Sequence, residues 1–107
     1  AMALAQEPKV LILDEPTTYL DINHQLEIME LLQELNRREG LTVVMVLHEL
    51  NQAAQYSHRI GVLYKGNILA DGSPKEVMTE ELLEKVFAVR TDVEVGEFPY
   101  IRIQGLL

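Results

Sequence analysis

The sequence of 107 residues contains no cysteine and has few positive charges. Without cysteine, the chain can form neither a disulfide framework nor a thiolate metal site. Its 9 basic residues against 17 acidic ones give a formal net charge of −8, which opposes binding to the phosphates of nucleic acids. No apolar run approaches the roughly 20 residues of a bilayer span. These absences argue against a disulfide-stabilised domain, a nucleic-acid-binding protein and an integral membrane protein.

Two short apolar runs predict the strands of a parallel sheet. Residues 10–13 are all apolar, residues 42–47 are apolar after the β-branched Thr42, and both runs are too short for helices, so we expect strands buried on both faces. Between them, apolar residues recur at helical spacing from Ile22 to Leu35, and Gly40 follows as a helix end. The order strand, helix, strand is a βαβ unit with an expected right-handed crossover. The fold class is therefore expected to be α/β.

Turn and cap residues predict shorter elements in the rest of the chain. Residues 1–6 read as the end of a helix that Glu7-Pro8 stops. The later elements are, in order, a helix from 50 to about 57, strands at 59–64 and 68–70 around a tight turn, helical turns after Ser73 and Thr79, and a small hairpin over 91–107. The expected architecture is thus a mostly parallel sheet with flanking helices and a small C-terminal β-hairpin.

Two adjacent acidic residues, Asp14 and Glu15, directly follow the first strand. An unpaired charge at the edge of a core costs several kcal/mol, so a cation is expected to meet them. Successive residues of an extended chain point to opposite sides, and the two carboxylates can therefore hold different roles. His48 follows the second strand. Because parallel strands end at the same edge of a sheet, all three side chains are expected at one ligand-binding edge.

The residues 14–17 (Asp-Glu-Pro-Thr), Leu20-Asp21 and His48 resemble the Walker B motif, D-loop and H-loop of the ATP-binding subunits of ABC transporters. The segments 64–66, 72–77 and 82–87 are similar to the importer branch, within it to ATPases for iron-siderophore, haem and cobalamin uptake. This resemblance implies a P-loop NTPase (RecA-like) nucleotide-binding domain. No stretch resembles the Walker A loop, the Q-loop or the LSGGQ-type motif, so residues 1–107 are expected to be the C-terminal portion of such a domain.

The resemblance also implies a role for each site residue, with ATP and Mg²⁺ as cofactors. Glu15 would be the catalytic carboxylate that orients or deprotonates the attacking water, and Asp14 would hold magnesium. His48 would contact the γ-phosphate, and Asp21 would lie in the D-loop that crosses to a second subunit. Simpler readings stay open: Glu15 as a solvated loop acid, His48 as a capping group, and Asp21 as the N-cap of the following helix.

The function that the resemblance implies is ATP hydrolysis in an ABC importer for an iron-siderophore or a related metal chelate, at the cytoplasmic face of the cell membrane. The partners would be a second ATPase subunit, transmembrane permease subunits and, indirectly, a periplasmic or lipoprotein substrate-binding protein, with no nucleic acid. The chain alone is expected to be inactive, because it has no phosphate cradle. The alternatives are a soluble ABC ATPase of DNA repair or translation, and an interaction module without chemistry.

Several further expectations concern single residues and the sheet. Tyr19 and Glu49 depart from the common family pattern, which has a small residue and Asp there. His24 and His58 have no metal-ligand partners at useful spacing and are expected to be surface or capping residues. In the order implied by the resemblance, a Walker A strand would lie between the strands at 42–47 and 59–64. Its absence leaves unpaired edges, which a rearrangement, a strand-swapped or edge-paired homodimer, or another chain would cover.

Overall fold

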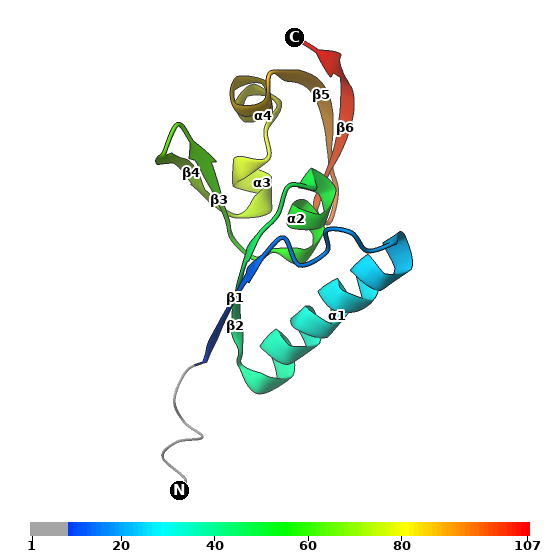
Figure 1. The fold of residues 1–107 in the computed structure, drawn as a ribbon. Helices are drawn as coiled ribbons and strands as arrows, with labels where there is room; N and C mark the ends of the chain where they lie inside the picture. The colour runs from blue at the N-terminus through cyan, green and yellow to red at the C-terminus, as the bar shows by residue number, and fades with distance from the viewer. Residues whose placement is uncertain (1–8) are drawn as a thin grey trace, which may run out of the picture. The chain divides into compact units, whose positions relative to one another are not determined.

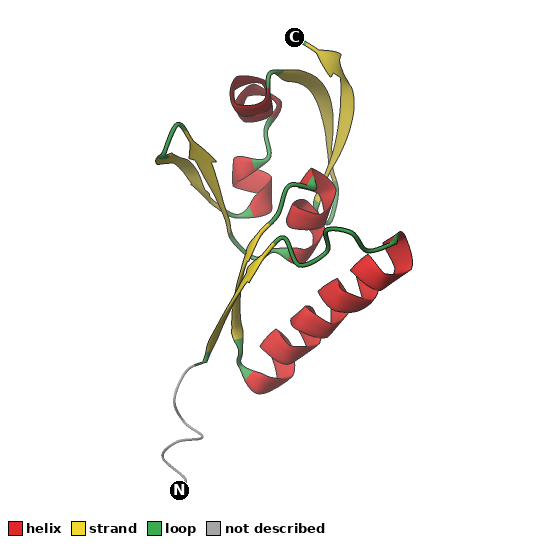
Figure 2. Ribbon diagram, in the orientation of Figure 1, coloured by secondary structure: helices red, strands yellow, loops and turns green. Residues whose placement is uncertain are grey.

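The computed structural model describes residues 9–107, which form four helices and six strands (Figure 1; Figure 2). The expected helix end at residues 1–6 and its stop at Glu7-Pro8 lie outside the described residues. The chain divides into two compact units, one ending at His48 and the other running from Glu49 to Leu107. Each unit is described by itself below.

The first unit is the expected βαβ arrangement. Strand β1 (Val10–Asp14) is followed by helix α1 (Ile22–Glu39) and strand β2 (Thr42–Val46), and the two strands pair in parallel. Their register sets the last residue of β1, Asp14, opposite the last residue of β2. Both strands therefore end at the same edge of the sheet, as the sequence pattern predicts.

Helix α1 begins and ends where its cap residues predict. The Asp21 carboxylate accepts a hydrogen bond from the main chain of the first turn, and Gly40 ends the helix in the left-handed conformation at φ +67°. Arg37 and Arg38 in the last turn both form ion pairs with Glu34. Positive charges there also complement the negative end of the helix dipole. Local capping and charge are thus sufficient to fix both ends of this helix.

The prediction that the two strands are buried on both faces is wrong for this chain. Every second side chain of β1 and β2 is exposed, and those that point to the other face are half-buried. Among residues 9–48, α1 is the one helix available to cover the two-stranded sheet, and a helix covers a single face. The exposed apolar residues are Val10, Ile12, Val44 and Val46.

The second unit contains three helices and two hairpins, all close to the expected positions. In chain order they are α2 (Leu50–Tyr56), β3 (Ile60–Tyr64), β4 (Asn67–Gly72), α3 (Pro74–Val77), α4 (Glu80–Phe87), β5 (Val89–Val95) and β6 (Pro99–Leu106). Strand β3 pairs with β4 through a turn at Lys65-Gly66, in which both residues have positive φ. Strand β5 pairs with β6, and both hairpins are antiparallel.

The α/β class is confirmed, but the expected mostly parallel sheet is not found in the described part of the chain. Its strands form three two-stranded sheets, of which only β1–β2 is parallel. The reason lies in the connections, because a two-residue turn returns the chain beside its own strand, whereas a parallel neighbour needs a long crossover. Strand β3 accordingly takes β4 as its hydrogen-bonding partner.

The core of the second unit is built by residues from its helices and from β3 and β6. Leu83 of α4 is fully buried, and five further apolar residues are less than a tenth exposed. The helices that carry this core start at the predicted caps: Ser73 and Glu76 form a reciprocal capping box, and Thr79 caps α4. The buried cluster consists of Ala54, Ile60, Val77, Met78, Leu83 and Ile101.

The capping box makes one contribution to stability that depends on pH. The Glu76 carboxylate accepts a hydrogen bond of 2.9 Å from the Ser73 main-chain N–H, which lowers the pKa of Glu76 below its ordinary value of 4.5. A carboxyl group whose pKa is lower in the folded state than in the unfolded state stabilises the fold at pH values above its unfolded-state pKa. This stabilisation is lost as the pH falls through the pKa of the folded state. When the pH is lowered from neutral to about pH 3, the free energy of unfolding of Glu76→Gln is therefore expected to fall less than that of the wild type. Urea denaturation measures both. Glu97→Gln, at an exposed acid of the β5–β6 turn, is the control and is expected to follow the wild type.

Candidate functional site

The candidate site lies at the edge of the β1–β2 sheet where both strands end. Asp14 is the last residue of β1, and Glu15 continues the pairing by donating its main-chain N–H to the Val46 carbonyl at 2.9 Å. His48 follows β2 after one intervening residue. The parallel register therefore brings residues 14, 15 and 48 to one place from positions more than thirty apart in the sequence.

Glu15 and His48, the two predicted catalytic residues, are in direct contact. Nε2 of His48 lies against Oε1 of Glu15, and the pair is ionic when the imidazole is protonated. The side chain of Glu15 is 37% exposed and that of His48 is 76% exposed. Because both groups remain open to solvent, a water molecule or a ligand can reach the carboxylate without a rearrangement of the sheet.

Glu15 has an unusual backbone conformation, with φ at +49°. The left-handed region costs an L-residue about 1–2 kcal/mol, and such strain is often found at functional sites. The conformation turns the chain sharply out of β1, because the Glu15 carbonyl accepts a hydrogen bond from Thr18 N–H at 3.2 Å and a second turn follows between Thr17 and Leu20. Nothing in the residue types predicts this conformation, since glutamate is not a residue that favours positive φ.

Asp14 is exposed, and among the described residues its carboxylate has neither a hydrogen bond nor an ion pair. The same part of the chain holds no group of three or more His, Asp or Glu side chains that could bind a metal by themselves. Magnesium, however, usually binds through one or two carboxylates together with water and substrate phosphates. The donor set at positions 14 and 15 therefore fits a magnesium ion that arrives with a phosphate ligand, and the role of Asp14 stays a prediction.

Asp21 is the N-cap of α1, which confirms the simpler of the two readings of this residue. Its carboxylate accepts a hydrogen bond of 3.2 Å from the main-chain N–H of His24 and also lies 2.5 Å from His24 Nδ1. His24 is thus an exposed residue at the helix cap, as expected from the absence of metal-ligand partners. Capping does not exclude a second role for Asp21, and contact with another subunit stays a prediction.

Removal of the Asp21 cap gives a testable change in stability. Asp21→Ala is expected to lower the free energy of unfolding by about 1 kcal/mol, within the usual range for the loss of an N-cap. Asp21→Asn is the matched control: it keeps an oxygen that can accept from His24 N–H, and it should retain most of the stability. Equal losses in the two variants, measured by chemical denaturation, would show that the charge rather than the cap is important.

Both residues that depart from the family pattern have clear structural positions. Tyr19 has φ +71°, and its side chain is fully exposed, so it packs against none of the described residues of the first unit. Glu49 is the N-cap of α2, where its carboxylate accepts hydrogen bonds from Asn51 N–H at 3.3 Å and Gln52 N–H at 2.7 Å. Sequence reasoning missed this capping role, although a carboxylate just before the apolar-periodic residues of a helix is a signal that could have shown it.

Comparison with known proteins identifies close relatives among import proteins, although no family model matches the chain. It is 53% identical over 96 residues to the petrobactin import ATP-binding protein FpuC of Bacillus anthracis, which covers 90% of this chain and 35% of the relative. It is 52% identical over 90 residues to the ferric enterobactin transport ATP-binding protein FepC of Escherichia coli. This match covers 84% of this chain and 33% of FepC. The hemin import ATP-binding protein HmuV of Mesorhizobium japonicum is 42% identical over 108 residues. This match covers 98% of this chain and 41% of HmuV.

Solved structures give the same result. A transporter described as of the metal-chelate ABC type, in an inward-facing conformation, matches 90% of this chain and 40% of its own with a TM-score of 0.78 and 27% identity. CbiO1 from Clostridium perfringens, part of the ABC transporter complex cbiONQ, matches 73% of this chain and 31% of its own. The TM-score of this match is 0.62, and the sequence identity is 38%. The chain spans about a third of the length of FpuC and FepC. Over the segment that it spans, the chain therefore belongs to the family of ABC transporter ATP-binding proteins.

Proposed function

We propose that the chain is the C-terminal portion of the ATP-hydrolysing subunit of an ABC importer for an iron-siderophore or a related metal chelate. The observation that carries the proposal is the contact between Glu15 and His48 beside Asp14, at the carboxyl edge of two parallel strands. Ligands of α/β proteins bind at this edge. Relatives about half identical to the chain are named for petrobactin import and ferric enterobactin transport, which supports the substrate class.

In the proposed reaction, each of the three side chains has a separate task. Bound ATP with Mg²⁺ supplies the phosphoryl group and the positive charge that the transfer requires. Asp14 would hold the metal through hard carboxylate oxygens, directly or through water. Glu15 would orient the attacking water and accept its proton. Such a general base typically raises the reaction rate by a factor of about 10² to 10⁴.

His48 would have two positions in this mechanism. In the present structure its Nε2 lies against the Glu15 carboxylate, which keeps that carboxylate at the edge of the sheet. When nucleotide is bound, the same nitrogen would donate a hydrogen bond to a γ-phosphate oxygen. Because the side chain is 76% exposed, the ring can turn from one partner to the other without the removal of a covering group.

The proposal places the protein on the cytoplasmic face of the cell membrane, bound to permease subunits and to a second ATPase subunit, with a substrate-binding protein as an indirect partner. None of the helices within residues 9–107 is long and apolar enough to cross a bilayer. The relative cbiO1 is described as part of a transporter complex, which supports assembly with other subunits.

A soluble ABC ATPase of DNA repair or translation is less well supported. The relatives reported above are named for import or transport. The net charge of −8 also opposes contact with a nucleic-acid backbone. An interaction module without chemistry would not require a strained glutamate in contact with a histidine at the end of a strand. Both observations favour the importer.

The proposal is tested by reconstitution of the complete subunit with its permease in proteoliposomes. ATP hydrolysis and uptake of a radiolabelled iron-siderophore are measured together, and both are expected to depend on Mg²⁺. Hydrolysis that is independent of the permease, with no uptake of iron, would contradict the proposal. The 107-residue chain alone is expected to show no turnover, and turnover that disappears in Glu15→Gln would contradict the expectation that it is inactive alone.

A further inference from the structure

The loop of residues 15–21, which leads from β1 to α1, contains two overlapping turns. In the first turn, the Glu15 carbonyl accepts a hydrogen bond of 3.2 Å from Thr18 N–H. In the second turn, the Thr17 carbonyl accepts a hydrogen bond of 3.3 Å from Leu20 N–H. Because both turns contain Thr17 and Thr18, a displacement of the second turn also displaces the first, in which Glu15 lies.

Gln25, on the first turn of α1, binds the end of this loop. Its side-chain Nε2 donates a hydrogen bond of 2.9 Å to the Leu20 carbonyl, and its main-chain N–H donates one of 2.9 Å to the Asp21 carbonyl. The main-chain bond is the ordinary first bond of a helix, which the N-cap carbonyl accepts. The side-chain bond is an additional link, since the carbonyl before an N-cap has no partner within the helix. One side chain thus attaches the loop to α1.

The main chain at Glu15 requires support from its surroundings, because its φ of +49° is strained. Strained conformations persist only while the surrounding contacts hold them. On one side, the hydrogen bond to the Val46 carbonyl fixes the Glu15 N–H to β2. On the other side, the two turns continue to Leu20, whose carbonyl is bound by Gln25. Glu15 is therefore held from both sides, and Gln25 provides a contact with α1 on the second side.

We propose that Gln25 is a positioning residue for Glu15 in ATP hydrolysis. This inference rests on the proposed function, because it gives Gln25 a role through a carboxylate that acts on the attacking water. Without the amide of Gln25, the turn that ends at Leu20 loses its attachment to α1. The main chain at Glu15 can then relax toward negative φ, and the carboxylate spends less time in its position beside His48.

Asn36 provides a closely matched control at the other end of α1. Its Nδ2 donates a hydrogen bond of 2.8 Å to the Leu41 carbonyl, again to a residue five positions away in the sequence. Gln25 and Asn36 are both partly buried. Leu41 directly precedes β2, so this link lies at the end of the sheet opposite to the candidate site. Loosening of α1 as a whole should affect variants of both residues, whereas loosening of the loop of residues 15–21 should affect Gln25 variants alone.

The test compares ATP hydrolysis by the complete subunit and by its variants Gln25→Met and Asn36→Leu. Both substitutions remove the amide donor, keep nearly the same side-chain size, add no charge and introduce good helix formers. Gln25→Met is expected to lower kcat by about 10- to 100-fold with little change in the KM for ATP, because misplacement of a catalytic group by about 1 Å can have such an effect. Asn36→Leu should remain within about twofold of the wild type.

Two further variants test whether the effect acts through Glu15. In the Glu15→Gln background, Gln25→Met should cause no further loss of kcat, since residues that act as a unit are not additive. Gln25→Glu keeps the shape of glutamine but, when ionised, cannot donate to the Leu20 carbonyl, and it should lower kcat at least as much as Gln25→Met. It also replaces Gln25→Met if that variant does not fold, because an acidic residue in the first turn favours the helix.

Amide hydrogen exchange in the complete subunit is a readout that does not depend on hydrolysis. The N–H groups of Thr18 and Leu20 close the two turns, so in Gln25→Met both should exchange with solvent about tenfold faster than in the wild type, or more. In Asn36→Leu their exchange should be unchanged. NMR spectroscopy measures each N–H group separately.

The outcomes separate this inference from the function on which it rests. If Glu15→Gln lowers hydrolysis and Gln25→Met lowers it by the same factor with and without that change, the positioning role is wrong and the proposed function stands. Equal effects of Gln25→Met and Asn36→Leu on kcat, or unchanged exchange of Thr18 and Leu20 in Gln25→Met, would also overturn the positioning role. If Glu15→Gln leaves hydrolysis unchanged, the assigned role of Glu15 and the inference about Gln25 both fail.

Discussion

Glu15→Gln is expected to lower the rate at which the complete subunit hydrolyses ATP by a factor of about 10² to 10⁴, while ATP binding is retained. Glutamine has nearly the same size as glutamate and can keep a hydrogen bond to His48, but it cannot accept a proton from the attacking water. The loss should therefore appear in kcat and leave the dissociation constant for ATP near that of the wild type. Steady-state hydrolysis and equilibrium binding of a fluorescent ATP analogue measure the two quantities.

Glu27→Gln is the matched control for this substitution, because Glu27 is an exposed acid on α1 in the same unit. It changes the net charge by the same amount and is expected to leave hydrolysis unchanged. A Glu15→Gln subunit that retains turnover within about tenfold of the wild type would show that Glu15 is not the general base.

Leu83→Ala is expected to destabilise the second unit by about 2–5 kcal/mol, the usual cost of truncating a large buried side chain. Leu83 of α4 is 0% exposed and packs in the cluster that joins the helices to β3 and β6. A unit of this size is typically stable by only about 3–9 kcal/mol, so the variant should lose most of its resistance to denaturation. Urea denaturation followed by circular dichroism measures the difference.

Leu63→Ala provides a control with the same chemical change in the same unit. Leu63 of β3 is 71% exposed, and its truncation leaves no cavity. Its effect should lie within about 0.5 kcal/mol of zero, as is usual for surface substitutions. A loss in Leu63→Ala as large as that in Leu83→Ala would contradict the assignment of the core.

The elements that local chemistry determines could be predicted from the sequence. Asp21 and Gly40 mark the ends of α1, and Ser73 and Thr79 mark the starts of the next two helical turns after β4. In each case a side chain or a glycine satisfies main-chain groups only a few residues away, so no knowledge of the rest of the fold is needed. The same holds for the turn at residues 65–67, where the chain reverses within its own hairpin.

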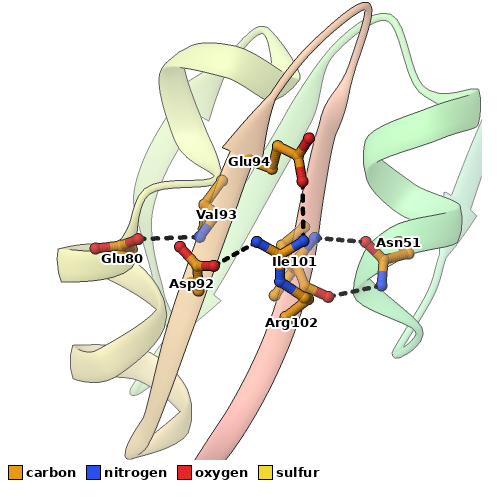
Figure 3. A network of polar contacts seen from close by, with 7 residues as sticks. All are labelled: Asn51, Glu80, Asp92, Val93, Glu94, Ile101 and Arg102. Atoms are coloured by element: carbon orange, nitrogen blue, oxygen red, sulfur yellow. Dashed lines mark hydrogen bonds and ion pairs between the residues drawn. The ribbon is translucent and has the colours of Figure 1, made fainter.

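Features that depend on distant parts of the chain could not be predicted. The run at residues 10–13 has the pattern of a strand covered on both faces, yet Ile12 is exposed, because no second layer lies over it among the described residues of the first unit. An apolar pattern describes the side chains and cannot supply the layer that covers them. The two hydrogen bonds between the side-chain amide of Asn51 and the main chain of Ile101 (Figure 3) were missed for a similar reason, since fifty residues separate the two and neither belongs to a motif.

The candidate site was partly predictable. Parallel strands end at one edge, and the proximity of Glu15 and His48 followed from the ends of two apolar runs. The positive φ of Glu15 was not predictable, because the hydrogen bond from its N–H to the Val46 carbonyl forms only after the two strands pair. The sequence therefore placed Glu15 and His48 at one edge of the sheet, whereas the structure supplied the conformation in which Glu15 is held.

We propose that the edge formed by Asp14, Glu15 and His48 binds the magnesium-bound phosphates of ATP. A crystal structure of the complete Glu15→Gln subunit with ATP and Mg²⁺ is the decisive test. We expect the γ-phosphate in hydrogen-bond contact with His48, the metal beside Asp14, and a water molecule between residue 15 and the phosphorus. A nucleotide bound away from this edge, with His48 still turned toward residue 15, would contradict it.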